Sequence, residues 1–197
     1  IIVIIKLGAL KIWKLWFFLS VWFCLTVAFK AFIGQNLALI FGFLFSLGKV
    51  FWRKVILHNL TELFIYGGLA VIFVPIFNVV SISILLGLIS LYDMYAVWKS
   101  KHMVGMAKFQ AKSRLFTGLL IPYKGRDAIL GGGDIGFPLI YTGVIMKYFG
   151  IYAYIITFFV TLALFGLLIA SEKNKFYPAM PILSLGCFLG FLVINFL

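Results

Sequence analysis

Runs of apolar residues about as long as a bilayer is thick are the feature that most restricts how this chain can fold. A membrane-spanning helix needs about 20 such residues. The chain has seven candidate runs: Ile12 to Phe29, Ile33 to Leu47, Leu60 to Phe77, Val79 to Trp98, Gly131 to Tyr148, Ile151 to Ala170, and Pro178 to Leu197. Because backbone amides cannot stay unpaired in hydrocarbon, each run is expected to be a helix. The sequence therefore predicts an all-α polytopic membrane protein.

The amino-acid composition agrees with this fold class and argues against nucleic-acid binding, which a high positive charge would otherwise suggest. Hydrophobic residues make up 64% of the chain, and the mean hydropathy is +1.18. The net charge of +12 would suggest nucleic-acid binding in a soluble protein. In a membrane protein it is explained by the excess of Lys and Arg in cytoplasmic loops. We therefore expect a lipid bilayer, and no nucleic acid, as the surrounding partner.

The distribution of basic residues predicts an orientation. Of the 17 Lys and Arg residues, all except Lys30 and Lys147 fall on one side of the predicted spans. The basic loop 99–126 is on that side, so it is predicted to be cytoplasmic, with the C-terminus outside. Lys49 is counted with Arg53 and Lys54 in a basic stretch on this cytoplasmic side.

Two aspartates lie inside apolar runs, where an ionised carboxylate costs about 2.5 to 3.5 kcal/mol even on lenient scales. They are Asp93 and Asp134, and such residues are expected to be functional. Glu62 is interpreted differently, as a structural first-turn acid near the wet interface, and His58 as an interfacial residue without a partner pattern. From the residues alone, a buried hydrogen-bonded pair, an ion pathway and catalysis all remain open for the two aspartates.

No metal site or disulfide is predicted. Cys24 and Cys187 are isolated in apolar runs, without the spacing of metal ligands. Both are interpreted as small buried hydrophobic residues.

Three short motifs occur in order on separate apolar runs. Tyr92-Asp93 is followed by Gly131-Gly132-Gly133-Asp134, which has the form G-x-G-D, and then by Pro178-Ala179-Met180-Pro181 at the start of the last run. This constellation resembles the presenilin and signal peptide peptidase family of intramembrane aspartyl proteases. The predicted orientation is that of presenilins, and the small loops suggest a prokaryotic, most naturally archaeal, member. Two departures are the Met180 where the family has leucine, and seven spans plus the short run Ile1 to Ile5 where the family has nine spans.

The resemblance implies a cofactor-free protease that cleaves single-span membrane proteins, with homo-oligomerisation left open. Asp93 and Asp134 would be the catalytic residues and would face each other across adjacent helices. A strand before G-x-G-D would pair with the unwound substrate, and the proline motif would close the cleft. The implied substrate-binding residues are Tyr92, Arg126, Asp127, Ala128, Ile129, Leu130, Gly131, Gly132, Gly133, Pro178, Ala179, Met180 and Pro181.

The predicted organisation divides the chain into N-terminal membrane helices, 1–78, and a catalytic part, 79–197. Two other functions are considered. Prepilin peptidases also carry G-x-G-D, but typically with a lysine two residues after the aspartate, where this chain has Gly136. A proton- or cation-coupled transporter would use Asp93, Asp134 and Glu62 as relay sites.

Overall fold

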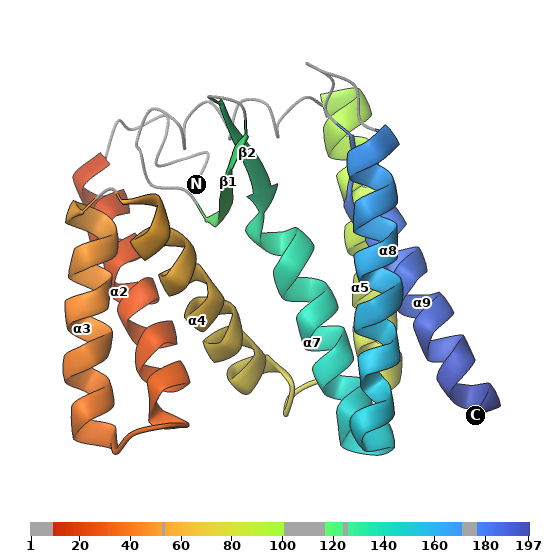
Figure 1. Ribbon diagram of the computed structural model, residues 1–197, viewed down its shortest axis with the longest axis horizontal. Coiled ribbons are helices and arrows are strands. Elements are labelled where there is room, and N and C mark those ends of the chain that lie inside the picture. The colour runs from red at the N-terminus through yellow and green to blue at the C-terminus, as the bar shows by residue number, and fades with distance from the viewer. Residues whose placement is uncertain (1–9, 53, 101–116, 124–125, 171–176) are drawn as a thin grey trace. The chain divides into compact units, whose positions relative to one another are not determined.

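The computed structural model describes residues 10–52, 54–100, 117–123, 126–170 and 177–197. The helices are α2 (Leu10–Lys30), α3 (Gln35–Phe51), α4 (Val55–Phe73), α5 (Val79–Tyr95), α7 (Gly132–Phe149), α8 (Tyr154–Ala170) and α9 (Met180–Phe196). Short helical turns follow α5 and precede α8, namely η1 (Ala96–Ser100) and η2 (Gly150–Ala153), and the strands are β1 (Gly118–Tyr123) and β2 (Arg126–Gly131). Figure 1 shows these elements along the chain. The chain forms two compact units, residues 1–72 with 106–132, and residues 73–105 with 133–197.

Each predicted apolar run overlaps one of the seven α-helices of the described residues, so the prediction of a helical membrane protein is confirmed at that level. The largest difference in boundaries concerns α4, which begins at Val55 rather than Leu60 and ends at Phe73 rather than Phe77. Pro75 follows its last turn, and proline lacks the amide that would continue a helix. The run Ile1 to Ile5 lies outside the described residues.

The first unit packs α2, α3 and α4 around a core of aromatic and aliphatic side chains. Trp13, Phe17 and Leu25 of α2 meet Ala38 of α3 and Ile65 of α4 in this core. Gly68 is required where α4 approaches α2, because a Cβ there would lie 2.2 Å from the carbonyl oxygen of Cys24. Small residues at such contacts are what allow membrane helices to pack closely.

A β-hairpin completes the described part of the first unit, so this part of the chain is not purely helical. β1 and β2 pair antiparallel, with Gly118 opposite Gly131 and Tyr123 opposite Arg126. β1 lies within the predicted basic loop 99–126, whose residues 101–116 and 124–125 are outside the described residues. β2 ends where α7 begins, which makes the hairpin the direct lead into the G-x-G-D aspartate.

The second unit contains α5, α7, α8 and α9, which share one hydrophobic core. Leu86, Tyr141, Ile156 and Cys187 contribute one buried side chain from each of these helices. α8 and α9 approach closely at Gly190, where a Cβ would lie 2.6 Å from the Cα of Ile156. The four helices therefore form one packed body that carries both candidate aspartates.

Two local devices fix the beginning of α5. Asn78 and Ser81 form a capping box, in which the Ser81 amide donates to Asn78 Oδ1 at 2.8 Å and the Asn78 amide donates to Ser81 Oγ at 3.0 Å. The Lys147 ammonium donates to the carbonyls of Val74 and Phe77, each at 3.0 Å. These bonds satisfy polar groups in the turn before α5 and attach that turn to α7.

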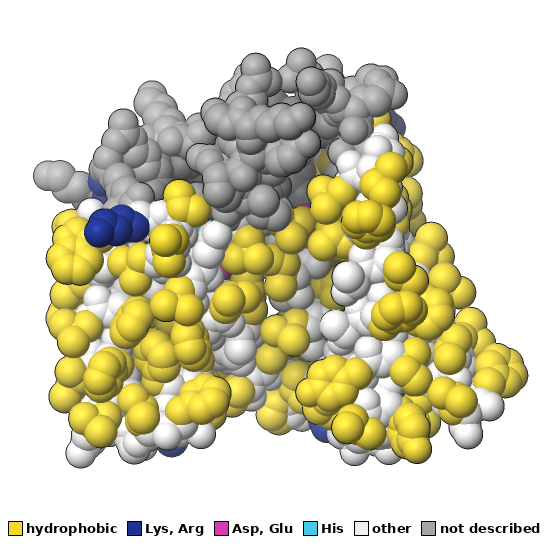
Figure 2. All heavy atoms as spheres, viewed as in Figure 1, with side chains coloured by type: hydrophobic (Ala, Val, Ile, Leu, Met, Phe, Trp, Pro, Cys, Tyr) yellow, Lys and Arg dark blue, Asp and Glu magenta, His cyan; other side chains and the backbone are white. Residues whose placement is uncertain are grey.

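Hydrophobic side chains cover much of the helices on the face drawn in Figure 2. Ile56, Trp98 and Phe196 are examples of large apolar side chains more than 60% exposed. By length and composition, four stretches of the described residues can cross a membrane: Ile12–Lys30, Val55–Phe73, Val79–Lys99 and Gly132–Ala170. Gln35–Phe51 and Met180–Phe196 are shorter apolar helices. These long apolar helices mark the chain as a membrane-embedded protein.

Candidate active site

Asp93 lies in the last turn of α5 and is almost completely buried. The helix turns Ile82, Leu86, Ser90 and Asp93 toward the interior of the second unit, at the spacing of one helical face. Asp93 is 4% exposed, whereas Tyr92, which the resemblance places in substrate binding, is 60% exposed. The two residues of the Tyr-Asp motif therefore point to different sides of α5.

The structure brings Asp93 together with the proline motif. The backbone N–H of Met180 donates to Asp93 Oδ2 at 3.1 Å. Met180 is the first residue of α9, preceded by Ala179 as N-cap and followed by Pro181. The first amides of a helix have no partner within it and lie at the positive end of the helix dipole. Asp93 thus satisfies an otherwise unpaired amide, and that amide favours negative charge on the carboxylate.

A pair of serines lies beside this contact, and the sequence analysis did not identify it as part of the site. The hydroxyl groups of Ser90 and Ser184 are hydrogen-bonded at 2.7 Å. Ser90 Oγ also donates to the Leu86 carbonyl at 2.8 Å and lies 3.3 Å from the Met180 carbonyl oxygen. Both serines are nearly buried, at 8% and 3% exposure. The spacing of Ser90 one turn before Asp93 is the signal that could have identified it, because it puts both side chains on one face of α5.

Asp134 is the third residue of α7 and is half-buried. It follows Gly132 and Gly133 at the junction with β2, in a first turn that Pro138 also affects. Proline has no N–H, so the usual helical bond from position 138 to the carbonyl four residues earlier, that of Asp134, cannot form. Asp134 therefore lies in the first turn of α7, in the same compact unit as Asp93. The facing arrangement of the two carboxylates stays a prediction.

The remaining predicted substrate-binding residues divide into two groups. Pro178 and Met180 are buried in the second unit, beside Asp93, while Ala179 and Pro181 are half-buried. Residues 126–131 form β2, as the resemblance implies, and their backbone pairs with β1 on one edge. The side chains of 126–129 are outside the described residues.

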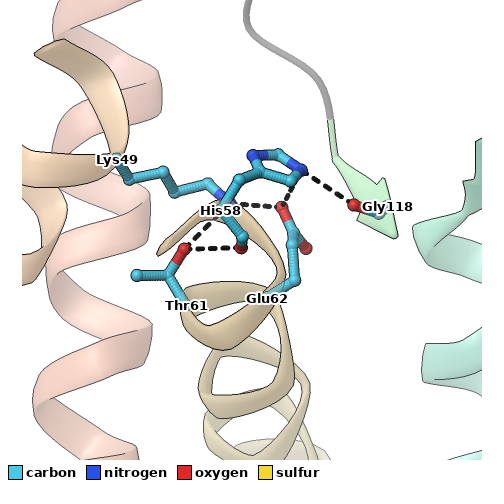
Figure 3. A network of polar contacts seen from close by, with 5 residues as sticks. All are labelled: Lys49, His58, Thr61, Glu62 and Gly118. Atoms are coloured by element: carbon cyan, nitrogen blue, oxygen red, sulfur yellow. Dashed lines mark hydrogen bonds and ion pairs between the residues drawn. The ribbon is translucent and has the colours of Figure 1, made fainter. Parts of the chain in front are cut away.

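The expectation that Glu62 is solvated is wrong, whereas the interfacial position expected for His58 stays a prediction. Glu62 is fully buried, and the Lys49 ammonium donates to its Oε1 at 2.5 Å. His58 Nε2 lies 2.9 Å from the carbonyl oxygen of Gly118 in β1. Figure 3 shows these side chains converging between α3, α4 and β1. The sequence did not reveal them because Lys49 and Glu62 lie on different helices and meet only when α3 packs against α4.

Within the described residues, no group of three or more His, Cys, Asp or Glu side chains could hold a metal ion. The chain matches no protein-family model and no curated protein sequence.

Proposed function

We propose that this protein is an intramembrane aspartyl protease in which Asp93 and Asp134 form the catalytic pair. The observation that carries the proposal is the hydrogen bond from the Met180 amide to Asp93. It joins two motifs that are 87 residues apart in the chain and that the sequence singled out independently. A buried carboxylate held by a helix N-terminus, in an otherwise apolar body, is the kind of group that performs acid-base chemistry.

The chemistry follows from what peptide hydrolysis requires. Two neighbouring carboxylates cannot both ionise cheaply, so the pair shares one proton and titrates as a unit. The charged carboxylate takes a proton from a bound water, which attacks the scissile carbonyl, while the protonated carboxyl donates to the carbonyl oxygen. The Met180 amide would hold Asp93 in one orientation through this cycle. Ser90 and Ser184 would act as positioning residues that keep the start of α9 in place.

The substrate we propose is a single-span membrane helix, unwound before cleavage. An intact helix hides its amides, so the scissile region must adopt extended backbone. β2 has one edge paired with β1 and leads directly to Asp134. A substrate strand added to β2 would gain backbone hydrogen bonds in the way that extended peptides add to a sheet edge.

We further propose a multi-pass arrangement in which loop 99–126 is cytoplasmic and the C-terminus is outside. The support is the strong asymmetry of Lys and Arg across the apolar helices. In this arrangement, Asp93 lies near the end of its helix that leads into the basic loop. Water would reach the carboxylates from that side.

The relay alternative is not favoured, because Glu62 belongs to the other compact unit and already has a cation as its partner.

The test is a cleavage assay with the full-length protein reconstituted in lipid. A single-span peptide is incubated with and without a transition-state mimic that carries a hydroxyl in place of the scissile carbonyl. We expect cleavage inside the apolar segment and inhibition by the mimic. Cuts only at the edge of a basic leader would instead support a prepilin-type peptidase. Proton-driven flux into liposomes without any peptide cleavage would support a transporter.

A geometric test accompanies the assay. In a variant with Cys24 and Cys187 replaced by alanine, Asp93→Cys and Asp134→Cys are introduced together. Facing carboxyl groups place their Cβ atoms somewhat farther apart than the roughly 3.5 to 4.5 Å of a disulfide, so a short bifunctional thiol reagent is used. Efficient cross-linking by this reagent is expected, and its absence under conditions that cross-link a control pair would contradict the pairing.

A further inference from the structure

A buried polar cluster in the first unit is not used by the proposed mechanism. We define the Lys49 cluster as Lys49, His58, Thr61 and Glu62 together with the carbonyl of Gly118 (Figure 3). Lys49 Nζ lies 2.5 Å from Glu62 Oε1 and 3.4 Å from Thr61 Oγ1. The Thr61 hydroxyl in turn donates to the backbone carbonyl of His58 at 2.8 Å. The cluster therefore ties the end of α3 to the first turns of α4.

The cluster is expensive to build, which argues that it does more than fill space. The side chains of Lys49 and Glu62 are 2% and 0% exposed. Burying two charges costs several kcal/mol per ion before their attraction is counted, and apolar residues of similar volume often serve stability as well or better. A buried ion pair is thus weak evidence for stability, and in some proteins it instead specifies one arrangement of the elements around it.

Here the arrangement in question is the position of the β1–β2 hairpin relative to α4. His58 Nε2 lies 2.9 Å from the Gly118 carbonyl oxygen, at the first residue of β1, and 3.9 Å from Glu62 Oε1. Gly118 has φ of +144°, a conformation that residues with a Cβ rarely adopt. The ring of His58 thus binds the end of β1 at a glycine whose backbone conformation other residues rarely adopt.

The same face of α4 also touches the end of the other strand. Tyr66 follows Glu62 by one helical turn, and its hydroxyl would lie 3.1 Å from a Cβ placed on Gly132. Gly132 is the residue directly after β2, and its amide donates to the Thr117 carbonyl at 3.3 Å. His58, Glu62 and Tyr66 thus form a stripe at i, i+4 and i+8 along α4. This stripe contacts the hairpin at the end from which β2 continues to Asp134.

An isolated two-stranded hairpin is marginally stable at best. We infer that His58 is a positioning residue, itself held by the Lys49–Glu62 pair, that fixes β1 and thereby the strand β2 on which substrate is bound. This inference rests on the proposed function only for the role of β2 in binding substrate. The anchoring of the hairpin by His58 is measurable without any catalysis.

The experiment compares three variants of the full-length protein in lipid. His58→Leu removes the donor to Gly118, His58→Gln keeps an N–H at a similar distance from the backbone, and Ile56→Ala is a control at a position of the same helix that is 84% exposed. Hydrogen exchange of the β1 and β2 amides is measured for each, with kcat and KM for a single-span peptide. Affinity for a small transition-state mimic that reaches only the aspartates is measured as well.

We expect His58→Leu to exchange the strand amides roughly 3- to 10-fold faster and to raise KM by a similar factor, as loss of one hydrogen bond predicts. kcat and the affinity for the mimic should change little, and His58→Gln should restore both exchange and KM. Strand exchange equal to wild type in His58→Leu would overturn the anchor, whether or not the protein cleaves peptides. Faster exchange with unchanged KM would overturn the link between the anchor and substrate binding. A protein that shows the exchange effect but cleaves no peptide would contradict the proposed function while leaving the anchor supported.

Discussion

Glu62 and Asp93 are both carboxylates buried in apolar helical units, but they have different hydrogen-bonding partners. Glu62 Oε1 lies 2.5 Å from the Lys49 ammonium, so a buried basic group is its direct partner. Among the described residues, no Lys, Arg or His nitrogen lies within 4.0 Å of Asp93, which accepts a backbone N–H from Met180 instead.

The two carboxylates therefore differ in the kind of group that compensates their burial. Glu62 lies beside a buried basic side chain, whereas Asp93 accepts its hydrogen bond from a neutral backbone amide. A carboxylate held only by neutral donors can lose or gain a proton without leaving an opposite charge buried. Under the proposed function, proton transfer belongs to the second unit, and the Lys49–Glu62 pair joins α3 to α4 in the first.

The largest expected effect concerns the aspartates. Asp93→Asn and Asp134→Asn should each reduce peptide cleavage by roughly 10²- to 10⁴-fold or more, because each removes a group that must exchange a proton. The folded protein should persist, since asparagine removes a buried charge. Cleavage rate and thermal unfolding of each variant are compared with Glu172→Gln, which removes a carboxylate in a polar stretch of the sequence. Near-normal cleavage by either aspartate variant would exclude the pair.

The next effect is on stability and tests the other side of the comparison. Glu62→Leu alone should lower the free energy of unfolding by about 3 to 5 kcal/mol, because it leaves the Lys49 charge buried without its partner. The double variant Lys49→Met with Glu62→Leu should recover most of that loss. Denaturant unfolding in detergent measures both. If the double variant folds well but loses cleavage as completely as Asp93→Asn does, Glu62 acts in proton transfer and the division between the units fails.

A smaller effect is expected at the start of α9. Pro178→Ala loosens the segment that presents the Met180 amide, and a hydrogen bond to a charged group contributes about 1.5 to 3 kcal/mol. Turnover should therefore fall by about tenfold or more, with weaker binding of the transition-state mimic and little change in melting temperature. Leu185→Ala, at a 60% exposed position of α9, is the control. Wild-type turnover would reduce the proline motif to a helix start.

The smallest effect is predicted for the serine pair. Ser184→Ala removes the 2.7 Å hydrogen bond to Ser90 but leaves the Asp93 contact itself intact. Loss of one neutral hydrogen bond predicts a fall in turnover of roughly two- to tenfold, with Ser184→Thr closer to wild type. Steady-state kinetics of the two variants separate this from a packing effect. A larger loss than in Pro178→Ala would mean that the serines, and not the proline, hold the amide.

Sequence reasoning reached the helices because their signal is local. A bilayer-length apolar run such as Val79 to Trp98 can satisfy its backbone in lipid only as a helix, whatever surrounds it. The G-x-G-D and proline motifs were visible for the same reason, as residue types whose cost in an apolar helix is high wherever they occur. The ends of α4 differ from the predicted ones because capping and turn formation depend on a few residues.

Sequence alone thus determined the fold class, the apolar helices and the two aspartates, since burial cost and helix length are properties of each segment by itself. Only the tertiary structure decided which residues on different helices contact each other. Asp93 gained the Met180 amide through the packing of α5 against α9, and Lys49 gained Glu62 through that of α3 against α4. Partners on different helices leave no spacing in the sequence. A carboxylate therefore shows in the sequence that it is costly to bury, but whether a cation or a backbone amide compensates that cost is settled only when the helices pack.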